Sequence, residues 1–230
     1  MKPATRTYWK KRLWPHLKNV VSTLVFVWFF TQHIAQATMV PTESMVPTIL
    51  VGDHFLLDKV AFPANYPKAV QRLLPERTIH RGDILVFRSP EDPDRQLVKR
   101  VIAIPGDILE IREGDLHING EKLDEPYVVH NLPSSLRPVA PVSDIGPIRI
   151  PSDSFFMMGD NRDNSRDSRY FGLVRRPALI GKPLFIYWSY QSAPYPDGGG
   201  TVREWAEYYA SVAMHFLTRT RWSRTGAILQ

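Results

Sequence analysis

The sequence predicts a mainly β protein with one apolar helix at its N-terminus and one amphipathic helix near its C-terminus. Three observations support this. The chain of 230 residues has a single long uncharged run, at residues 19–42. Most of residues 54–190 consists of short apolar-rich segments separated by Pro, Gly and Asp, which is typical of strands. Helical spacing of apolar residues returns over residues 202–217.

Charge and cysteine content exclude several classes of function. Residues 1–42 carry six of the 29 Lys and Arg residues and no acid, and the other 23 cations equal the 23 acids in number. The net charge of +6 therefore belongs to an N-terminal arm, and no nucleic-acid partner is indicated. The absence of Cys excludes disulfides, thiolate nucleophiles and thiolate metal sites. The seven His residues show no metal spacing, so we expect no metal and no cofactor.

The N-terminal region is predicted to be a basic cytoplasmic arm, residues 1–18, followed by a transmembrane signal-anchor, residues 19–42. As a helix, the 24 residues of this second segment are about 36 Å long, enough to cross the hydrocarbon core of a bilayer. Because positively charged flanks stay in the cytoplasm, residues 43–230 would be exported.

Two other interpretations of this segment stay open. Val20–Phe30, the densest apolar part of this segment, is short and is followed by Ala35-Gln36-Ala37. A basic arm, a short apolar core and an Ala-x-Ala pattern are together typical of a removable secretory signal. A buried helix of a soluble protein is the third possibility. If the anchor is retained, we expect Ala35–Ala37 to stay helical and so to present no extended bond to a protease.

One strand is expected within each of six segments of the body: residues 54–62, 83–89, 96–104, 107–113, 115–120 and 154–160. Two more strands are expected within residues 178–190. Hairpin turns are predicted at Gly114-Asp115 and Asn119-Gly120. Residues 124–151, with six prolines, are predicted to form an irregular excursion. An insertion over residues 191–220 contains the amphipathic helix, for which packing against the body is favoured over contact with lipid.

Ser44 stands in the proline-flanked stretch VPTESMVPTI, directly after the uncharged run. Neither a Gly-x-Ser-x-Gly elbow nor a Lys three residues after the Ser is present, which argues against two common classes of serine hydrolase. A Ser-His-Asp triad stays possible, since triads assemble in space. The other activator of a serine is a neutral lysine amine, which requires a Lys buried among apolar residues.

Lys99 meets that requirement, because it stands inside the apolar segment LVKRVIAI. Arg100 beside it does not, since a guanidinium stays protonated in proteins. Two solvated charges at a sheet edge are the plainer interpretation of this pair. A third block, MMGDNRDNSRDSRYFGLV at residues 157–174, is either an Asx-rich surface turn or a buried polar network. In such a network Asp167 would pair with Arg169, and Ser165 would orient the Lys99 amine.

Taken together, five stretches resemble the bacterial signal peptidase I family, which is also called leader peptidase. They occur in the family's order: VPTESMVPTI, GDHFLLDKVAF, RGDILVFRSPED, LVKRVIAIPGD and MGDNRDNSRDSRYFGLV. The resemblance covers about residues 20–190, and RWSRTGAIL at residues 221–229 looks like the family's final strand. It implies a signal-peptidase-type β fold and a membrane-bound serine endopeptidase that removes signal peptides from exported preproteins.

The resemblance also implies roles for individual residues. Ser44 matches the nucleophile, Lys99 the general base and Ser165 the residue that orients the lysine. The Ser44 backbone N–H and the Thr42 hydroxyl match the oxyanion-hole donors. Many relatives have Ser where this chain has Thr42, whose branched side chain limits its aim. Asp167 and Arg169 match a structural ion pair.

Specificity for small residues at positions −1 and −3 follows from the same resemblance. The −1 pocket would be walled by six residues: Val40, Pro41, Met45, Ile49, Leu97 and Met157. The expected partners are preprotein signal peptides and the lipid bilayer, and we expect a monomer. The expected location is the bacterial inner membrane, with a single pass, a cytoplasmic N-terminus and an extracytoplasmic catalytic domain.

Two competing functions are weighed against this one. A self-cleaving Ser–Lys protein of the repressor type would carry a DNA-binding domain ahead of the serine, where this chain has the uncharged run. An exported β-domain binding module would make Ser44 and Lys99 incidental.

Overall fold

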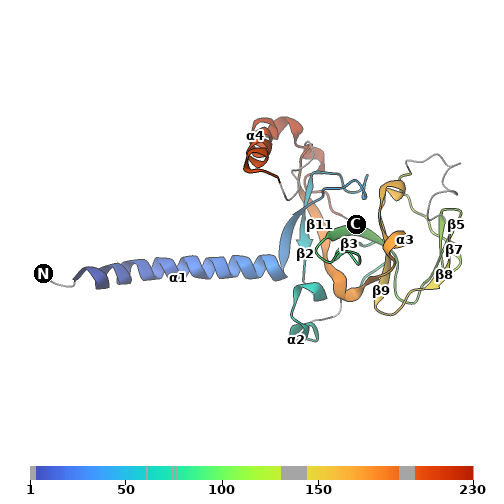
Figure 1. The fold of residues 1–230 in the computed structure, drawn as a ribbon, viewed down its shortest axis with the longest axis horizontal. Helices are drawn as coiled ribbons and strands as arrows, with labels where there is room; N and C mark the ends of the chain where they lie inside the picture. Colours follow the sequence, from blue (N-terminus) through green and yellow to red (C-terminus); the bar gives the residue numbers. More distant parts are fainter. Residues whose placement is uncertain are drawn as a thin grey trace.

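A computed structural model describes residues 4–60, 62–73, 75, 77–130, 144–191 and 200–229, with the backbone alone for residues 4–13 and 63. A long helix projects from a β-rich body (Figure 1). Helix α1 spans Ala4–His33 and strand β1, Ala35–Met39, follows after one residue. The described residues contain no helix with an apolar stretch sufficient to span a membrane.

Helix α1 ends at His33, so the expected helix over residues 19–42 is wrong for residues 34–42. Residues 35–39 pair antiparallel with β2, Asp53–Asp58, so Ala35–Ala37 is extended and the expectation that it stays helical is wrong as well. The physical reason is non-local, because the backbone groups of residues 35–39 are satisfied by a strand that the uncharged run itself does not contain.

The body contains a seven-stranded sheet in the order β1-β2-β11-β3-β4-β9-β10. Its remaining strands are β3 (Ile84–Arg88), β4 (Gln96–Ala103), β9 (Ser154–Met158), β10 (Val174–Arg175) and β11 (Leu179–Ser189). The two strands expected within residues 178–190 are one strand, β11, which pairs first with β3 and then with β2. Register shifts near Pro183 and Ile186 let this strand bend between its two partners.

A four-stranded sheet, β7-β6-β5-β8, forms the end of the body farthest from α1 (Figure 1). Its strands are β5 (Ile108–Arg112), β6 (Asp115–Ile118), β7 (Glu121–Lys122) and β8 (Ile145–Arg149). The turn between β5 and β6 is at Glu113-Gly114, one residue before the predicted position, and the next turn is at Asn119-Gly120 as predicted. All four turn residues have positive φ, which suits the right-handed twist of hairpins.

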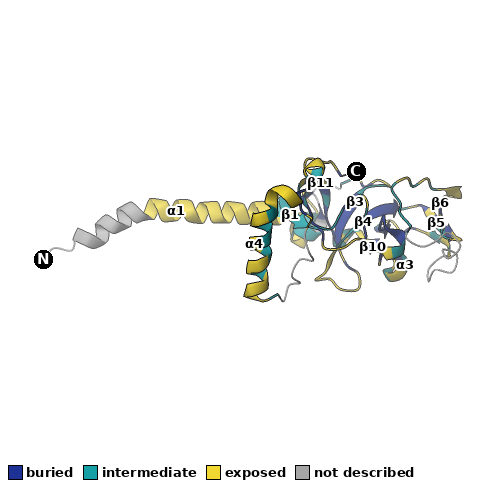
Figure 2. Cartoon of the chain, turned by 90° about the horizontal axis from the view of Figure 1, so that it is seen from above, coloured by how far each residue is buried: buried dark blue, intermediate teal, exposed yellow. Residues whose placement is uncertain are grey.

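Three apolar clusters fill the body, and all three contain residues of the large sheet. The third also contains residues of β5 and β6 and so joins the two sheets. Helix α1 contrasts with the body, because its described side chains are almost all exposed (Figure 2). Two short helices, α2 (Lys68–Gln71) and α3 (Ser168–Phe171), connect strands. The excursion predicted over residues 124–151 is partly outside the described residues and includes β8.

The C-terminal helix is present as expected. Helix α4 spans Val202–Arg219 and lies at the end of the body from which α1 leaves (Figures 1 and 2). It contacts the body through Trp188 and Tyr190, yet none of its residues is buried. The segment expected as a final strand, residues 221–229, begins with a 3-10 turn at Trp222–Arg224 and does not form a regular strand. It still lies along β11, through a bridge between Phe185 and Ile228 and backbone hydrogen bonds such as that from the Leu229 N–H to the Leu184 carbonyl.

Candidate active site

Ser44 and Lys99 are brought together although 55 residues separate them. Lys99 lies in β4, opposite Leu85 of β3, and Ser44 lies in the loop after β1. Lys99 Nζ and Ser44 Oγ are hydrogen-bonded, and both residues are buried, Lys99 with 2% of its surface exposed. The solvated sheet-edge interpretation of Lys99 is therefore wrong, because the apolar strand carries the amine into the interior.

Burial lowers the pKa of the Lys99 ammonium from 10.5 to about 8. Desolvation is the main cause, since a charge is costly to hold away from water. The Asp167 carboxylate opposes this change, whereas the nearby Arg169 and Arg95 guanidinium groups favour it. A substantial fraction of Lys99 is thus neutral near pH 8 and able to accept a proton.

Asn161 holds the loop that carries Ser44. Its backbone N–H donates to the Ser44 carbonyl at 3.1 Å, and its side-chain amide donates to the Glu43 carbonyl at 3.2 Å. Gly159 approaches the same loop so closely that a Cβ added to it would lie 2.4 Å from the Ser44 carbonyl oxygen. The sequence interpretation missed both residues, although each belongs to the MGDNR motif directly after β9.

Thr42 lies close to the Ser44 hydroxyl, whereas Ser165 makes no hydrogen bond to Lys99. Thr42 Oγ1 is 3.5 Å from Ser44 Oγ, on the exposed side of the loop. Ser165 is buried beside Gly159, but its hydroxyl has no hydrogen-bond partner among the described residues. The predicted bond from Ser165 to the Lys99 amine is therefore not formed in this structure.

Asp167 and Arg169 form an ion pair with two N–O distances of 2.9 Å, and Asp167 is fully buried. The Asp167 carboxylate also accepts the Gly159 N–H at 3.1 Å, so the pair supports the strand end that contacts Ser44. Arg169 donates in turn to the Arg162 carbonyl at 2.6 Å. The Asx-rich surface turn, the plainer interpretation of residues 157–174, is wrong because these groups are buried and mutually bonded.

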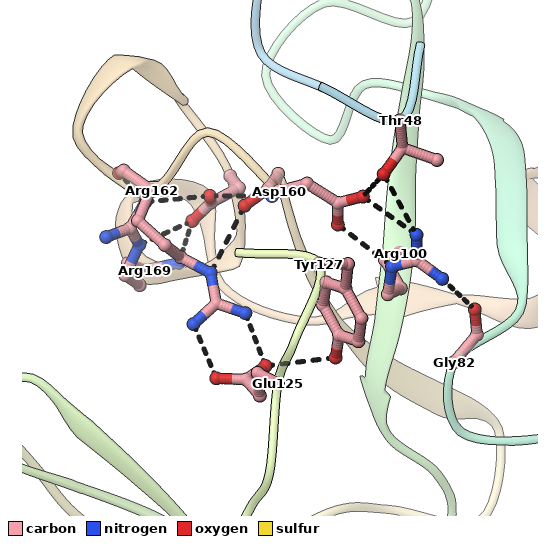
Figure 3. Close-up of polar contacts among 10 residues, drawn as sticks. Thr48, Gly82, Arg100, Glu125, Tyr127, Asp160, Arg162 and Arg169 are labelled. Atoms are coloured by element: carbon pink, nitrogen blue, oxygen red, sulfur yellow. Dashed lines mark hydrogen bonds and ion pairs between the residues drawn. The ribbon is translucent and has the colours of Figure 1, made fainter. Parts of the chain in front are cut away.

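A second polar network lies beside the site and was not predicted (Figure 3). Buried Arg100 donates to both oxygens of Asp160, at 2.9 and 2.8 Å, and stacks on the Tyr127 ring at 4.0 Å. The Tyr127 hydroxyl donates to Glu125, which also pairs with Arg162. A charged residue in the middle of an apolar strand was the available signal for a buried partner to Arg100.

Two pockets meet at Ser44 and Lys99. The larger, about 280 Å³, is lined on one side by residues 38–42 and on the other by residues 95–99. The smaller, about 190 Å³, lies toward Glu43, Glu91, Arg95 and Arg166. Five residues line both pockets: Thr42, Ser44, Arg95, Leu97 and Lys99.

Half of the predicted wall of the −1 pocket lines the larger pocket: Val40, Pro41 and Leu97. The other half does not line either pocket. Met45, Ile49 and Met157 are fully buried in the apolar clusters beneath the site. In this structure these three side chains are part of the apolar core, so their contact with a substrate stays a prediction.

Among the described residues, no group of three or more His, Asp or Glu side chains could hold a metal ion. A hydroxyl bonded to a buried amine of lowered pKa is an arrangement in which a serine can be activated as a nucleophile.

Comparison with known proteins identifies the family. Residues 13–188 match the family described as signal peptidase, peptidase S26. A signal peptidase I of Leptolyngbya laminosa is 32% identical, with 75% of this chain and 78% of the relative covered. A signal peptidase I of Pseudomonas aeruginosa is 31% identical, with 75% and 72% covered. The chain belongs to the signal peptidase I family.

A solved structure, a signal peptidase I from Enterococcus faecalis, is 33% identical and matches 46% of this chain and 97% of its own, with a TM-score of 0.38. Family membership makes this protein a serine endopeptidase of the signal peptidase type. The non-enzymatic binding module is thereby wrong.

Proposed function

We propose that this protein is a membrane-bound endopeptidase that removes signal peptides after small residues at positions −1 and −3, with Ser44 as nucleophile and Lys99 as general base. The observation that carries the proposal is the buried Ser44–Lys99 hydrogen bond at the meeting point of two pockets. The larger pocket would receive the signal peptide and the smaller one the start of the mature protein.

The chemistry uses one amine twice. The neutral Lys99 amine removes the hydroxyl proton of Ser44 while the Ser44 Oγ forms a bond to the scissile carbonyl carbon. Among the described residues nothing accepts the Ser44 backbone N–H, so this group is free to donate to the oxyanion, and the Thr42 hydroxyl is near enough to be the second donor. The Lys99 ammonium then gives its proton to the leaving amine, and the neutral amine activates the water that releases the acyl group.

Two free backbone edges support binding of an extended substrate. Val40 directs both its N–H and its C=O toward residues 52 and 53, so Met39 and Pro41 face away from β2. Strand β9 pairs with β4 only from Arg100 onward, which leaves residues 96–98 of β4 unpaired on that side. A peptide lying between these edges would add as a strand, and small side chains would fit the narrow cup lined by Val40 and Leu97.

Helix α1 is the proposed membrane anchor, with residues 1–18 in the cytoplasm and residues 43–230 on the extracytoplasmic face of the bacterial inner membrane. Support comes from the family, from the basic arm, and from apolar side chains exposed around its surface, such as Leu24, Phe26 and Trp28. Anchoring would concentrate the enzyme on the surface where signal peptides are inserted. Sodium carbonate extraction of cell membranes tests this: the anchored protein stays in the pellet, and release into the supernatant contradicts the anchor.

A cleavage assay tests the mechanism. Wild-type protein should process a preprotein with Ala at −1 and −3 and should fail on the same preprotein with Trp at −1. Ser44→Ala, Lys99→Ala and Lys99→Arg should all be inactive with unchanged circular dichroism, since a guanidinium cannot accept the proton. Lys122→Ala, at an exposed lysine of β7, is the matched control and should remain active. Wild-type rates in Lys99→Ala would reject Lys99 as the base.

A further inference from the structure

The end of helix α1 is fastened to the body by side chains rather than capped by a glycine. The last carbonyls of a helix have no partner within the helix and need one elsewhere. Lys59 Nζ donates to the Thr31 carbonyl at 3.1 Å, and the Tyr66 hydroxyl donates to the His33 carbonyl at 3.0 Å. The Lys59 backbone N–H donates to the Ile34 carbonyl at 2.9 Å. We call these contacts the α1 joint.

Lys59 is unusual among the buried cations. Within the described residues four cationic side chains are buried: Lys59, Lys99, Arg100 and Arg162. Arg100 and Arg162 pair with carboxylates, and Lys99 bonds to Ser44. Lys59 Nζ, by contrast, bonds to the Thr31 carbonyl and to Gln36 Oε1 at 3.1 Å, and no carboxylate of the described residues pairs with it. Its charge is therefore directed at the negative end of the α1 dipole.

Tyr66 reinforces the same contact. Its ring stacks on the His33 ring with 5.1 Å between centroids, while its hydroxyl donates to the His33 carbonyl. Asn65, its neighbour, donates to the Lys59 carbonyl at 3.0 Å and to the Ile180 carbonyl at 2.6 Å, which ties the joint to β11. The joint is thus continuous with the large sheet.

The joint is also close to the nucleophile along the chain. Only Ile34 separates α1 from β1, and β1 is paired with β2 along its whole length. Ser44 lies ten residues beyond Ile34, a span of at most about 35 Å in an extended chain. A change in the angle of α1 would therefore reach the site through a paired strand, with no flexible linker between them.

We infer that Lys59 and Tyr66 are positioning residues that hold α1 at a fixed angle to the body and so set the height of Ser44 above the bilayer. This inference rests on the proposed membrane-bound peptidase function. A purely structural role of Lys59 and Tyr66 would affect cleavage of all substrates equally, whereas a positioning role would not. A loosened joint impairs cleavage of substrates held in the same membrane and leaves cleavage of free peptides unchanged.

The test compares two substrates of wild type, Lys59→Met, Tyr66→Phe and Lys59→Arg, all reconstituted in phosphatidylethanolamine–phosphatidylglycerol vesicles. One substrate is a preprotein inserted in the same vesicles, and the other is a soluble peptide with Ala at −1 and −3. Lys59→Met should lose about tenfold in kcat/KM on the preprotein and keep peptide cleavage. Tyr66→Phe should show a smaller loss of the same kind, and Lys59→Arg, which can still donate to Thr31, should recover most of the rate. Lys122→Met is the matched control.

A distance measurement provides an independent readout, because the chain has no Cys and accepts a single labelled pair. Spin labels at Ser22→Cys in α1 and His80→Cys on the exposed surface of the body should give one narrow distance distribution in wild type and a broad one in Lys59→Met.

The outcomes separate the two proposals. Failure of wild type on both substrates would reject the proposed function. Equal losses on both substrates in Tyr66→Phe, or unchanged distances together with unchanged preprotein cleavage in Lys59→Met, would overturn the joint as a positioning device.

Discussion

Lys99 combines opposite demands of catalysis and folding in one side chain. The proposed mechanism needs a neutral amine at Lys99, and burial of this side chain is the main reason that its pKa is lowered to about 8. The same burial makes the protonated form costly to the folded protein. Asp167 moderates this cost, because its carboxylate favours the charged amine.

We expect cleavage activity to rise with pH and to be half-maximal near pH 8, where the Lys99 amine loses its proton. The measurement is kcat/KM on a soluble peptide between pH 5.5 and 10. A rising limb near pH 6.5 would instead indicate a histidine base and would contradict the Lys99 mechanism.

Stability should depend on the same proton, with the following sign. Because the pKa of Lys99 is lowered from 10.5 to about 8 on folding, the unfolded chain binds more protons between these values, and stability rises with pH across this window. The cost, about 3 kcal/mol, is fully present below pH 8. Urea unfolding of wild type and Lys99→Met should therefore converge toward pH 10.5. A difference independent of pH would show that Lys99 is not buried.

Gly159 offers a separate test of the site, because a side chain at this position has no room. Gly159→Ala would place Cβ 2.3 Å from Ser165 Oγ and 2.4 Å from the Ser44 carbonyl, so the Ser44 loop must shift. We expect activity to fall by about 100-fold, as for misplaced catalytic groups in general. Gly146→Ala, in β8 with open space around it, is the control and should stay active. Equal activity of both variants would show that the loop position is unimportant.

At the scale of elements, the pairing of β1 with β2 decides the shape of the site. This pairing makes residues 35–39 an edge strand, and the residues that follow it line the larger pocket together with residues 95–99. Helix α4, by contrast, has few contacts with the body, so its stability depends on the capping of its ends. Its N-terminus carries a complete capping box, in which Thr201 and Glu204 bond reciprocally.

Thr201→Ala should therefore loosen α4 by about 1 kcal/mol, because the cap on the Glu204 N–H is lost. Hydrogen exchange of the α4 amides is the measurement, and peptide cleavage should not change. Thr218→Ala, inside the last turn of α4, is the control with the opposite sign, since Ala favours a helix interior over Thr. Equal protection in both variants would argue that packing, rather than the cap, holds the helix.

At the scale of the whole molecule, buried ion pairs join the two parts of the body. Arg100 of β4 and Asp160 after β9 meet Tyr127 and Glu125 of the segment that leads out of the small sheet. Arg162 closes this network on Glu125 (Figure 3). Breaking one such pair leaves a charge buried without its partner, which costs more than losing a pair in solvent.

We expect Asp160→Asn to lower the free energy of unfolding by about 3 kcal/mol, because Arg100 would remain buried beside a neutral amide. Urea denaturation measures this change. Glu91→Gln, which removes an exposed pair with Arg166, is the matched control and should leave stability unchanged. Equal changes in the free energy of unfolding of the two variants would contradict the burial of the Arg100–Asp160 pair.

The sequence by itself determined the class of fold, the helix at each end, most of the strands and the choice of Ser44 and Lys99 as the candidate pair, which the fold brings into hydrogen-bond contact. These features follow from local properties: apolar spacing, turn residues, and an amine inside an apolar segment beside a short motif. The amphipathic pattern over residues 202–217 matches α4 for the same reason.

Only the tertiary structure decided where α1 ends, which residues line the pockets, and which polar groups meet. Residues 35–39 look compatible with a helix until β2 offers its backbone, and Met45, Ile49 and Met157 look available to substrate until the core closes over them. The partners of Arg100 and Lys59 come from segments far away in the chain. Burial and pairing across such distances depend on all strands at once, so no local pattern contains them.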